Sequence, residues 1–168
     1  MKISVHEVDP RQCEPLLPLL LLAEPSESAL RWGLANLSDT VYEVRASGQV
    51  IGAATLRWKV EPPEILELAV APGWQGQGIG KQIVEWLIAE AQRRGKQQLV
   101  VGTGNSSIGN IVFYQRCGFR MDHVRKDYFW YYREPIFENG IRARDMLVFR
   151  YEIEGSEDGH APRLSDSI

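Results

Sequence analysis

Residues 66–81 read Leu66-Glu67-Leu68-Ala69-Val70-Ala71-Pro72-Gly73-Trp74-Gln75-Gly76-Gln77-Gly78-Ile79-Gly80-Lys81, and this stretch decides the fold. It begins as an apolar strand, turns at Pro72-Gly73, and continues through three alternating glycines into an amphipathic helix. Glycines allow a ligand to approach the backbone closely, and the free N–H groups at a helix N-terminus carry partial positive charge. The stretch is therefore typical of a turn that binds an anion such as phosphate.

Two common nucleotide-binding motifs do not fit this turn. The dinucleotide fingerprint GxGxxG, counted from Gly76 and Gly78, needs a third glycine at the position of Lys81. The loop GxxxxGK[ST] of nucleotide triphosphatases fails because Gln75 replaces its first glycine and Gln82 replaces its Ser or Thr. An anion would have to be bound here by a different kind of motif.

The rest of the chain predicts a mixed α/β sheet flanked by helices. Apolar alternation and β-rich runs predict strands at 3–8, 41–45, 50–58, 65–70, 98–101 and 146–153. Helical spacing predicts helices at 11–22, 26–36, 81–94 and for about ten residues from Ser107, with Gly95 as a C-terminal cap. The order is β-αα-βββ-α-β-α-β. We expect one domain over residues 1–153 and a disordered tail over 154–168, because the tail is rich in Ser, Asp, Glu and Gly.

Composition narrows the classes of protein. The 168 residues are 44% hydrophobic, enough for one buried core without disulfide or metal support. With 22 acidic and 19 basic residues, the net charge of −3 favours neither nucleic acid nor an anionic membrane as a partner. Two cysteines and three scattered histidines predict no disulfide framework and no metal site. The apolar run at 16–23 is too short to span a bilayer and follows acidic residues, so we expect a soluble cytoplasmic protein.

The glycine turn matches one further pattern, Gln/Arg-x-x-Gly-x-Gly/Ala, as Gln75-Gly76-Gln77-Gly78-Ile79-Gly80. This resembles the pyrophosphate-binding motif of the GNAT superfamily of N-acetyltransferases. Residues 68–72 resemble the family's strand and exit turn, and Phe113-Tyr114-Gln115-Arg116-Cys117-Gly118-Phe119 resembles a segment of its later helix. Residues 102–107 and 134–141 look like a bacterial subgroup of undefined substrate. The resemblance covers residues 3–153 and implies a mostly antiparallel central sheet.

The resemblance implies acetyl-CoA as co-substrate, with no metal. Backbone N–H groups of the turn would hold its pyrophosphate; the residues concerned are Gln75, Gly76, Gln77, Gly78, Ile79, Gly80 and Lys81. In the family the preceding strand splays from its neighbour, so Leu68, Ala69 and Val70 would pair with the pantetheine arm like an added strand. The Val70 amide would polarise the thioester carbonyl. The competing interpretation is an ordinary strand and an empty glycine-rich turn.

The resemblance also suggests how protons move. Tyr114 matches the family's general acid, which would protonate the departing thiolate, whereas its alternative role is packing with Ile111 and Phe113. The acceptor needs a base because only the neutral amine attacks. Glu67 interrupts an apolar run, which a polar cleft explains. Glu64 falls on the opposite face of a regular strand unless a bulge intervenes, and we interpret it as a solvated strand start.

Three features are open to more than one interpretation. Asn105 lies where the family's next turn approaches the cofactor arm, but many members carry Asn where this chain has Ser107, so helix capping by Asn105 or Ser106 is an equal alternative. We interpret Cys117 as buried filler. The aromatic run 128–132, followed by Glu134, Glu138 and Asp145, would suit a pocket for a cationic amine, although core packing or a homodimer interface is favoured.

We therefore expect acetyl transfer from acetyl-CoA to a primary amine by direct attack in a ternary complex. The acceptor would be a small-molecule or peptide amine, and longer acyl donors stay open. Two alternatives belong to other classes of protein. One is a sensor that binds CoA or an acyl-CoA without chemistry, and the other is a dimeric interaction protein whose glycine turn is empty.

Overall fold

A computed structural model describes residues 1–154, so the tail expected over 154–168 lies outside the described residues from position 155 on. Seven strands form one sheet in the order β1-β2-β3-β4-β5-β9-β6. They are β1 (Ser4–Val8), β2 (Thr40–Ala46), β3 (Gln49–Arg57), β4 (Glu64–Val70), β5 (Gln98–Gly104), β6 (Arg120–Arg125) and β9 (Met146–Glu152). A separate hairpin is made of β7 (Phe137–Glu138) and β8 (Ile141–Arg142). All pairs in the sheet are antiparallel except β4 with β5, so the mixed, mostly antiparallel sheet is confirmed.

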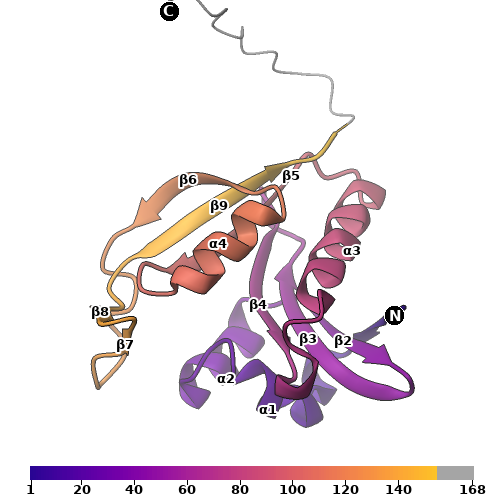
Figure 1. Cartoon of the computed structure of the whole chain (residues 1–168), viewed down its shortest axis with the longest axis horizontal. Helices are drawn as coiled ribbons and strands as arrows, with labels where there is room; N and C mark the ends of the chain where they lie inside the picture. The colour runs from indigo at the N-terminus through magenta and orange to yellow at the C-terminus, as the bar shows by residue number, and fades with distance from the viewer. Residues whose placement is uncertain (155–168) are drawn as a thin grey trace, which may run out of the picture.

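Helices cover both faces of the sheet. They are α1 (Leu17–Leu20), α2 (Glu27–Asn36), α3 (Ile79–Arg93) and α4 (Ile108–Arg116). The core beneath α3 contains Ile83 and Leu87 together with Tyr42 of β2, whereas α1 and α2 pack on Val41 of β2 and Ala53 of β3. Because Val41 and Tyr42 are neighbours on one strand, these two cores lie on opposite faces. Figure 1 shows α3 beside the β2–β4 half and α4 beside the β5–β9–β6 half.

Single residues explain where several helices and strands begin or end. Ser26 caps α2 by accepting the Ala29 N–H at 3.3 Å. Gly95, at φ +70°, ends α3, and the Lys96 N–H behind it donates to Ala91 C=O at 2.9 Å. The β2–β3 hairpin turns at Ser47 and Gly48, both at positive φ.

Two regions differ from the sequence prediction. The helix expected at 11–22 is two short 3₁₀ turns, Pro10–Gln12 and Glu14–Leu16, followed by the four residues of α1. Pro15 and Pro18 each remove a backbone donor, which prevents one continuous helix. The strand β6 and the β7–β8 hairpin were not anticipated. The β6 strand lies at the sheet edge and is mostly exposed, so its sequence carries no apolar alternation.

Within residues 1–154 no helix combines the length and the apolar character that crossing a membrane requires.

Candidate functional site

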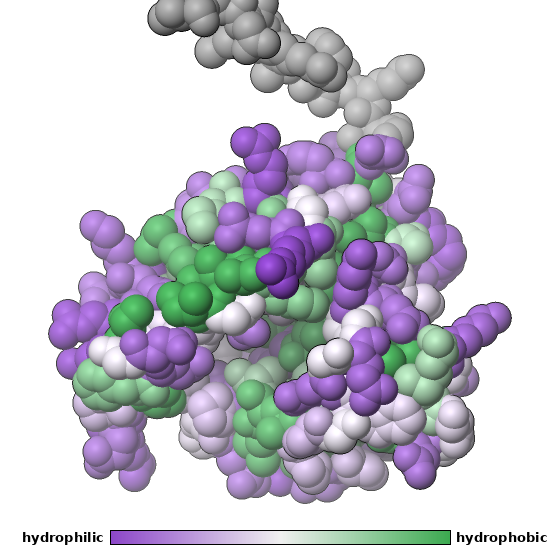
Figure 2. Space-filling view, in the orientation of Figure 1, coloured by the Kyte–Doolittle hydropathy of each residue, from purple (hydrophilic) through white to green (hydrophobic). Residues whose placement is uncertain are grey.

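The site begins where β4 and β5 separate. These parallel strands pair only at Glu64 with Val100 and at Ile65 with Val101, and the Val100 N–H also donates to Pro63 C=O at 2.9 Å. Beyond Ile65 the strands diverge, and a cleft of about 1860 Å³ opens between them. Figure 2 shows the hollow beneath the apolar surface of α4. The strand splay expected from the resemblance is thus present in the fold.

The divergence leaves one edge of β4 unpaired. On the other edge the Ala71 N–H donates to Ile51 C=O of β3 at 2.8 Å. Because backbone groups alternate along an antiparallel pair, Ala69 also faces β3, and Leu68 and Val70 face the cleft. The Val70 C=O accepts from Gln75 Nε2 at 2.9 Å. The N–H groups of Leu68 and Val70 are therefore directed into the cleft, and that of Ala69 is not.

The glycine turn forms the end of the cleft next to β4. Gly76 and Gly78 lie at φ +73° and +77°, and a Cβ at either position would meet nothing within 4 Å. The first helical hydrogen bond of α3 runs from the Gln82 N–H to Gly78 C=O at 3.1 Å. The N–H groups of residues 79–81 precede that bond and have no helical acceptor. The turn is thus a concave, open row of donors at a helix N-terminus.

The remaining turn residues shape this row of donors. Gln77 Nε2 donates to Gly73 C=O at 3.2 Å, which braces the turn from outside the cleft. Gly80 lies against the Phe113 ring, where a Cβ would come within 3.2 Å of Phe113 Cζ. Lys81 lines the cleft and pairs with Glu85 at 3.7 Å. Gly76 and Gly78 thus serve a backbone at positive φ, whereas Gly80 leaves room for the Phe113 ring.

Glu67 lies on β4 opposite Thr55 of β3 and lines the cleft. The Thr55 hydroxyl donates to the Glu67 carboxylate and accepts the Glu67 N–H at 3.1 Å. Burial raises the pKa of Glu67 to about 7; the Thr55 hydrogen bond opposes this rise, and the charges of Glu24 and Glu64 add to it. A carboxyl group with a pKa near neutrality is suited to exchange a proton with a ligand.

Glu64 corrects our expectation of a solvated strand start. A bulge leaves Leu66 unpaired, since Ile65 pairs with Leu56 and Glu67 pairs with Thr55. The bulge places both glutamates on one face of β4, and both line the cleft. Glu64 is only 7% exposed, and Arg125 pairs with it at 3.2 Å and Arg57 at 3.9 Å. Its charge is therefore neutralised locally, unlike that of Glu67.

Tyr114 of α4 packs among aromatic rings and also lines the cleft. Its ring packs against Phe113, Phe119 and Phe149 at centroid distances of 5.0, 5.8 and 6.4 Å. The residue is 7% exposed and lines the cleft, and its hydroxyl hydrogen-bonds no other residue within 1–154. Burial raises the pKa of the hydroxyl well above its usual value. Tyr114 thus keeps its proton and has an unused donor in the cleft. Cys117, which also lines the cleft, is partly exposed rather than buried.

Asn105 does not reach the cleft. Its Oδ1 accepts the N–H groups of Arg144 and Asp145 at 2.8 and 3.0 Å, and its Nδ2 donates to Arg142 C=O at 3.1 Å. The side chain therefore fastens the end of β5 to the segment before β9. The alternative prediction, that Asn105 or Ser106 caps the helix, is wrong as well. The N-cap residue of α4 is Ser107, and its side chain makes no capping hydrogen bond.

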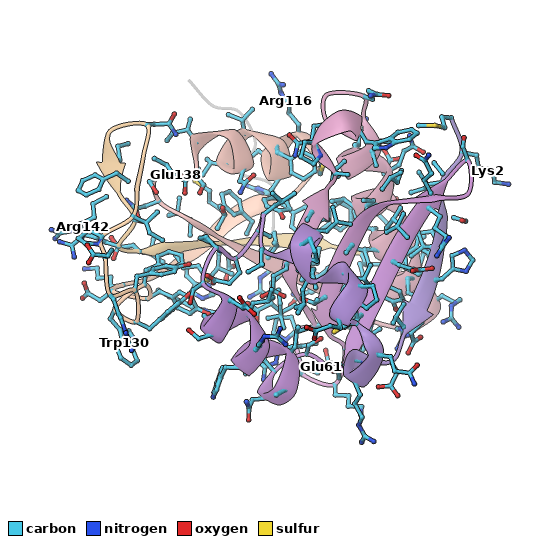
Figure 3. The ribbon with its side chains drawn as sticks, turned by 90° about the horizontal axis from the view of Figure 1, so that it is seen from below. Lys2, Glu61, Arg116, Trp130, Glu138 and Arg142 are labelled. Atoms are coloured by element: carbon cyan, nitrogen blue, oxygen red, sulfur yellow. The ribbon has the colours of Figure 1, made fainter. Side chains whose placement is uncertain are left out.

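Residues 128–132 form a turn rather than a strand, and all five aromatic side chains line the cleft. These aromatic residues are therefore not part of a buried core, and they are not divided between the two faces of a strand. Trp130 lies at the outer end of the molecule and is 84% exposed (Figure 3). Tyr131 and Tyr132 lie deeper, and their hydroxyls donate to Glu24 at 3.1 and 2.6 Å. Sequence reasoning missed Glu24, since only a contact across more than 100 residues places it in the cleft.

Metal chemistry has no candidate group here. Among the described residues, no three His, Cys, Asp or Glu side chains are grouped so that they could hold a metal ion.

Comparison with known proteins gives consistent matches. The profile of the acetyltransferase (GNAT) domain matches residues 38–121. An uncharacterized N-acetyltransferase, YvbK of Bacillus subtilis (strain 168), is 38% identical over 136 residues, which is 80% of this chain and 86% of the relative.

Two solved structures share the fold over nearly their whole length. A GNAT family acetyltransferase from Elizabethkingia anophelis with acetyl-CoA bound has a TM-score of 0.81 and 39% identity, covering 89% of this chain and 97% of that one. A Bacillus subtilis acetyltransferase in complex with CoA has a TM-score of 0.79 and 36% identity, covering 90% and 99%.

Proposed function

The chain belongs to the GNAT family of acetyltransferases, and we propose that it transfers an acetyl group from acetyl-CoA to a primary amine by direct attack. The observation that carries this proposal is the continuity of the β4 edge with the glycine turn. Free donors run from Leu68 and Val70 into the open row of N–H groups at residues 76–81. Such a row matches a ligand with an amide-bearing arm and a pyrophosphate, and the two solved relatives are described with acetyl-CoA and with CoA.

The residues present fit acetyl-CoA as co-substrate. Backbone N–H groups of the turn would bind the pyrophosphate, with Lys81 adding positive charge beside them. The N–H of Val70 would donate to the thioester oxygen, where negative charge develops during transfer. Bound acetyl-CoA supplies an acetyl carbon activated by a good thiolate leaving group.

Two side chains of the cleft would handle the protons. Glu67 would take a proton from the acceptor ammonium, directly or through water, which frees the amine to attack. Tyr114 would donate its hydroxyl proton to the departing sulfur. The new C–N bond replaces the C–S bond, and the second proton that the nitrogen loses replaces, through solvent, the one that Tyr114 gives to sulfur. An amide and free CoA are the products. A sensor that only binds CoA would have no use for a carboxyl group tuned to a pKa of about 7.

Calorimetric titration with acetyl-CoA tests the donor site, and release of free thiol on a panel of amines tests transfer. We expect micromolar binding by the wild type and loss of binding in Gly78→Glu, which adds a carboxylate at a turn residue that lines the cleft. Gly78→Ala reports the strain at positive φ alone, a cost of about 1–2 kcal/mol. Gly73→Glu adds the same charge at an open position with ordinary φ outside the cleft, and it should keep the wild-type affinity. A wild type that binds no CoA species would contradict the proposal, and binding without turnover of any amine would favour the sensor.

A further inference from the structure

The two ends of the cleft differ in charge. Lys81 of α3 and Arg116 of α4 line the end at the glycine turn, which suits an anionic ligand. At the other end Glu24 and Glu67 lie close enough for the charge of Glu24 to raise the pKa of Glu67. Lys126 and Asp127 add one charge of each sign. The end away from the turn is therefore acidic, and it is where an acceptor would enter.

Glu24 is fixed in position without being neutralised. Its Oε1 accepts from the Tyr132 hydroxyl at 2.6 Å and from the Ser26 N–H at 3.0 Å, and its Oε2 accepts from the Tyr131 hydroxyl at 3.1 Å. Among residues 1–154 no Lys, Arg or His pairs with it. Three neutral donors thus orient a carboxylate that has no cationic partner among residues 1–154, whereas Glu64 is paired with two arginines.

Aromatic rings surround this carboxylate. Tyr131 and Tyr132 lie 4.6 Å apart between centroids, and Phe129 stacks on Tyr132 at 5.8 Å with an interplanar angle of 22°. Tyr128 meets Tyr131 edge to face at 6.3 Å. Ring faces attract cations, and a carboxylate beside them supplies an ion-pair partner. A carboxylate held by tyrosine hydroxyls among aromatic faces is a site suited to an ammonium group.

Tyr114 and Glu67 supply the other polar groups of the cleft that a ligand could use. The Tyr114 hydroxyl lines the cleft and has no hydrogen-bond partner among the described residues, so it is free to donate. The cleft thus offers two sets of polar groups, Glu67 with Tyr114 and Glu24 with its two tyrosines.

We propose that Glu24, held by Tyr131 and Tyr132, binds a second ammonium group of the acceptor, so that the acceptors are α,ω-diamines and longer polyamines. This inference rests on the proposed function. One amino group lies at Glu67 and becomes acetylated, while the other pairs with Glu24 and sets the chain length. A monoamine would leave the Glu24 charge unpaired in a partly desolvated cleft.

The test compares n-alkylamines with α,ω-diamines of the same carbon number by kcat/KM for thiol release. We expect the wild type to prefer the diamine about tenfold or more at its best chain length. Glu24→Gln keeps the size of the side chain but removes its charge, and it should bring the diamine-to-monoamine ratio to about one. Tyr132→Phe removes the 2.6 Å donor and should lower the ratio in the same direction.

Glu27→Gln is the matched control. Glu27 lies three residues away, at the start of α2, and pairs with Arg31 at 3.0 Å outside the cleft, so this variant should keep the wild-type ratio. Dipeptides with a lysine side chain also carry two amino groups, and a preference confined to them would overturn the assignment to free diamines.

Failure of the subsite and failure of the proposed function give different results. Equal acetylation of monoamines and diamines, or a ratio unchanged in Glu24→Gln and Tyr132→Phe, overturns the subsite and leaves transfer standing. If the wild type acetylates no amine, the diamine is titrated calorimetrically into CoA-saturated protein. Binding that is lost in Glu24→Gln then supports the subsite although transfer fails, and no binding overturns it.

Discussion

At the scale of single residues, one unpaired position on β4 decides the chemistry of two carboxyl groups. The bulge at Leu66 places Glu64 and Glu67 on the same face. Arg57 and Arg125 neutralise Glu64, while within residues 1–154 the Glu67 carboxylate has only a threonine hydroxyl as partner. Desolvation without a cation therefore raises the pKa of Glu67, and this carboxyl group is fit to act as a base.

Replacement of Glu67 by Gln tests this role. We expect kcat to fall by about 10²–10⁴, the range for loss of a general base. In the wild type kcat should rise with pH through about 7, because only the ionised carboxylate accepts a proton. The variant should lack that rise. The pH profile of kcat with one amine acceptor measures both effects, and an unchanged profile in Glu67→Gln would assign the base elsewhere.

Tyr114→Phe removes only the hydroxyl. Since that hydroxyl has no hydrogen-bond partner among residues 1–154, the melting temperature should not fall and the ring contacts should persist. The thiolate is already a good leaving group, so we expect kcat to drop by about 10²-fold, the low end for general acids. Single-turnover rates with saturating acetyl-CoA measure it. A variant as fast as the wild type would leave Tyr114 a packing residue only.

At the scale of elements, β4 can line the cleft because one of its edges is hydrogen-bonded to β3 while most of the other edge is free. One edge pairs with β3 from Glu64 to Val70 except at the Leu66 bulge, and the other pairs with β5 at two positions before it faces the cleft. Gly52 of β3 permits the close approach on the paired edge. A Cβ at this position would lie 2.8 Å from Ala69 C=O and 3.2 Å from Ile83 Cδ1 of α3. Neither neighbour can shift easily, because the Ala69 carbonyl belongs to the sheet backbone and the Ile83 side chain is packed in the hydrophobic core.

A pair of glycine substitutions measures this constraint. Gly52→Ala should destabilise the protein by about 1–3 kcal/mol, the usual cost of overpacking. Gly33→Ala, in the interior of α2 where a Cβ meets nothing within 4 Å, should stabilise it by about 0.5–1 kcal/mol. Denaturant unfolding of both variants gives the two free energies. Equal effects of the same sign would show that helix and strand propensity, rather than close approach, govern these positions.

Local patterns predicted the elements that carry strong periodicity. The strand, turn and helix at 64–93 follow from alternation, glycines and helical spacing, and the structure agrees with the expected order there. The prediction of one helix over 11–22 was wrong because prolines interrupt an otherwise apolar run. The strand β6 was not predicted because an exposed edge strand needs no apolar alternation. The bulge at Leu66 left no local signal either, since it depends on how β3 pairs.

At the scale of the whole molecule, the site is closed by contacts between distant segments. Tyr131 and Tyr132 reach Glu24 across more than 100 positions, Arg125 reaches Glu64 across 61, and Asn105 fastens residues 142–145. A single sequence gives no sign of such pairings, so the β4 strand and the glycine turn were predictable and the opposite side of the cleft was not. Figure 1 shows the same division, with the motif-bearing β4 and α3 away from the β7–β8 end.

The partly buried Glu67 should also make global stability depend on pH. Its pKa is about 7 in the folded protein against 4.5 in the unfolded chain, so the folded state binds the proton more tightly. The stabilisation by this proton is complete below pH 4.5 and is lost as the pH rises through 7. Relative to Glu67→Gln, the wild type should lose at most about 3 kcal/mol over this interval. Urea unfolding of both proteins at several pH values measures the difference. Parallel stability curves would mean that the carboxylate is solvated in the open cleft, and its role as a base tuned by burial would then fail as well.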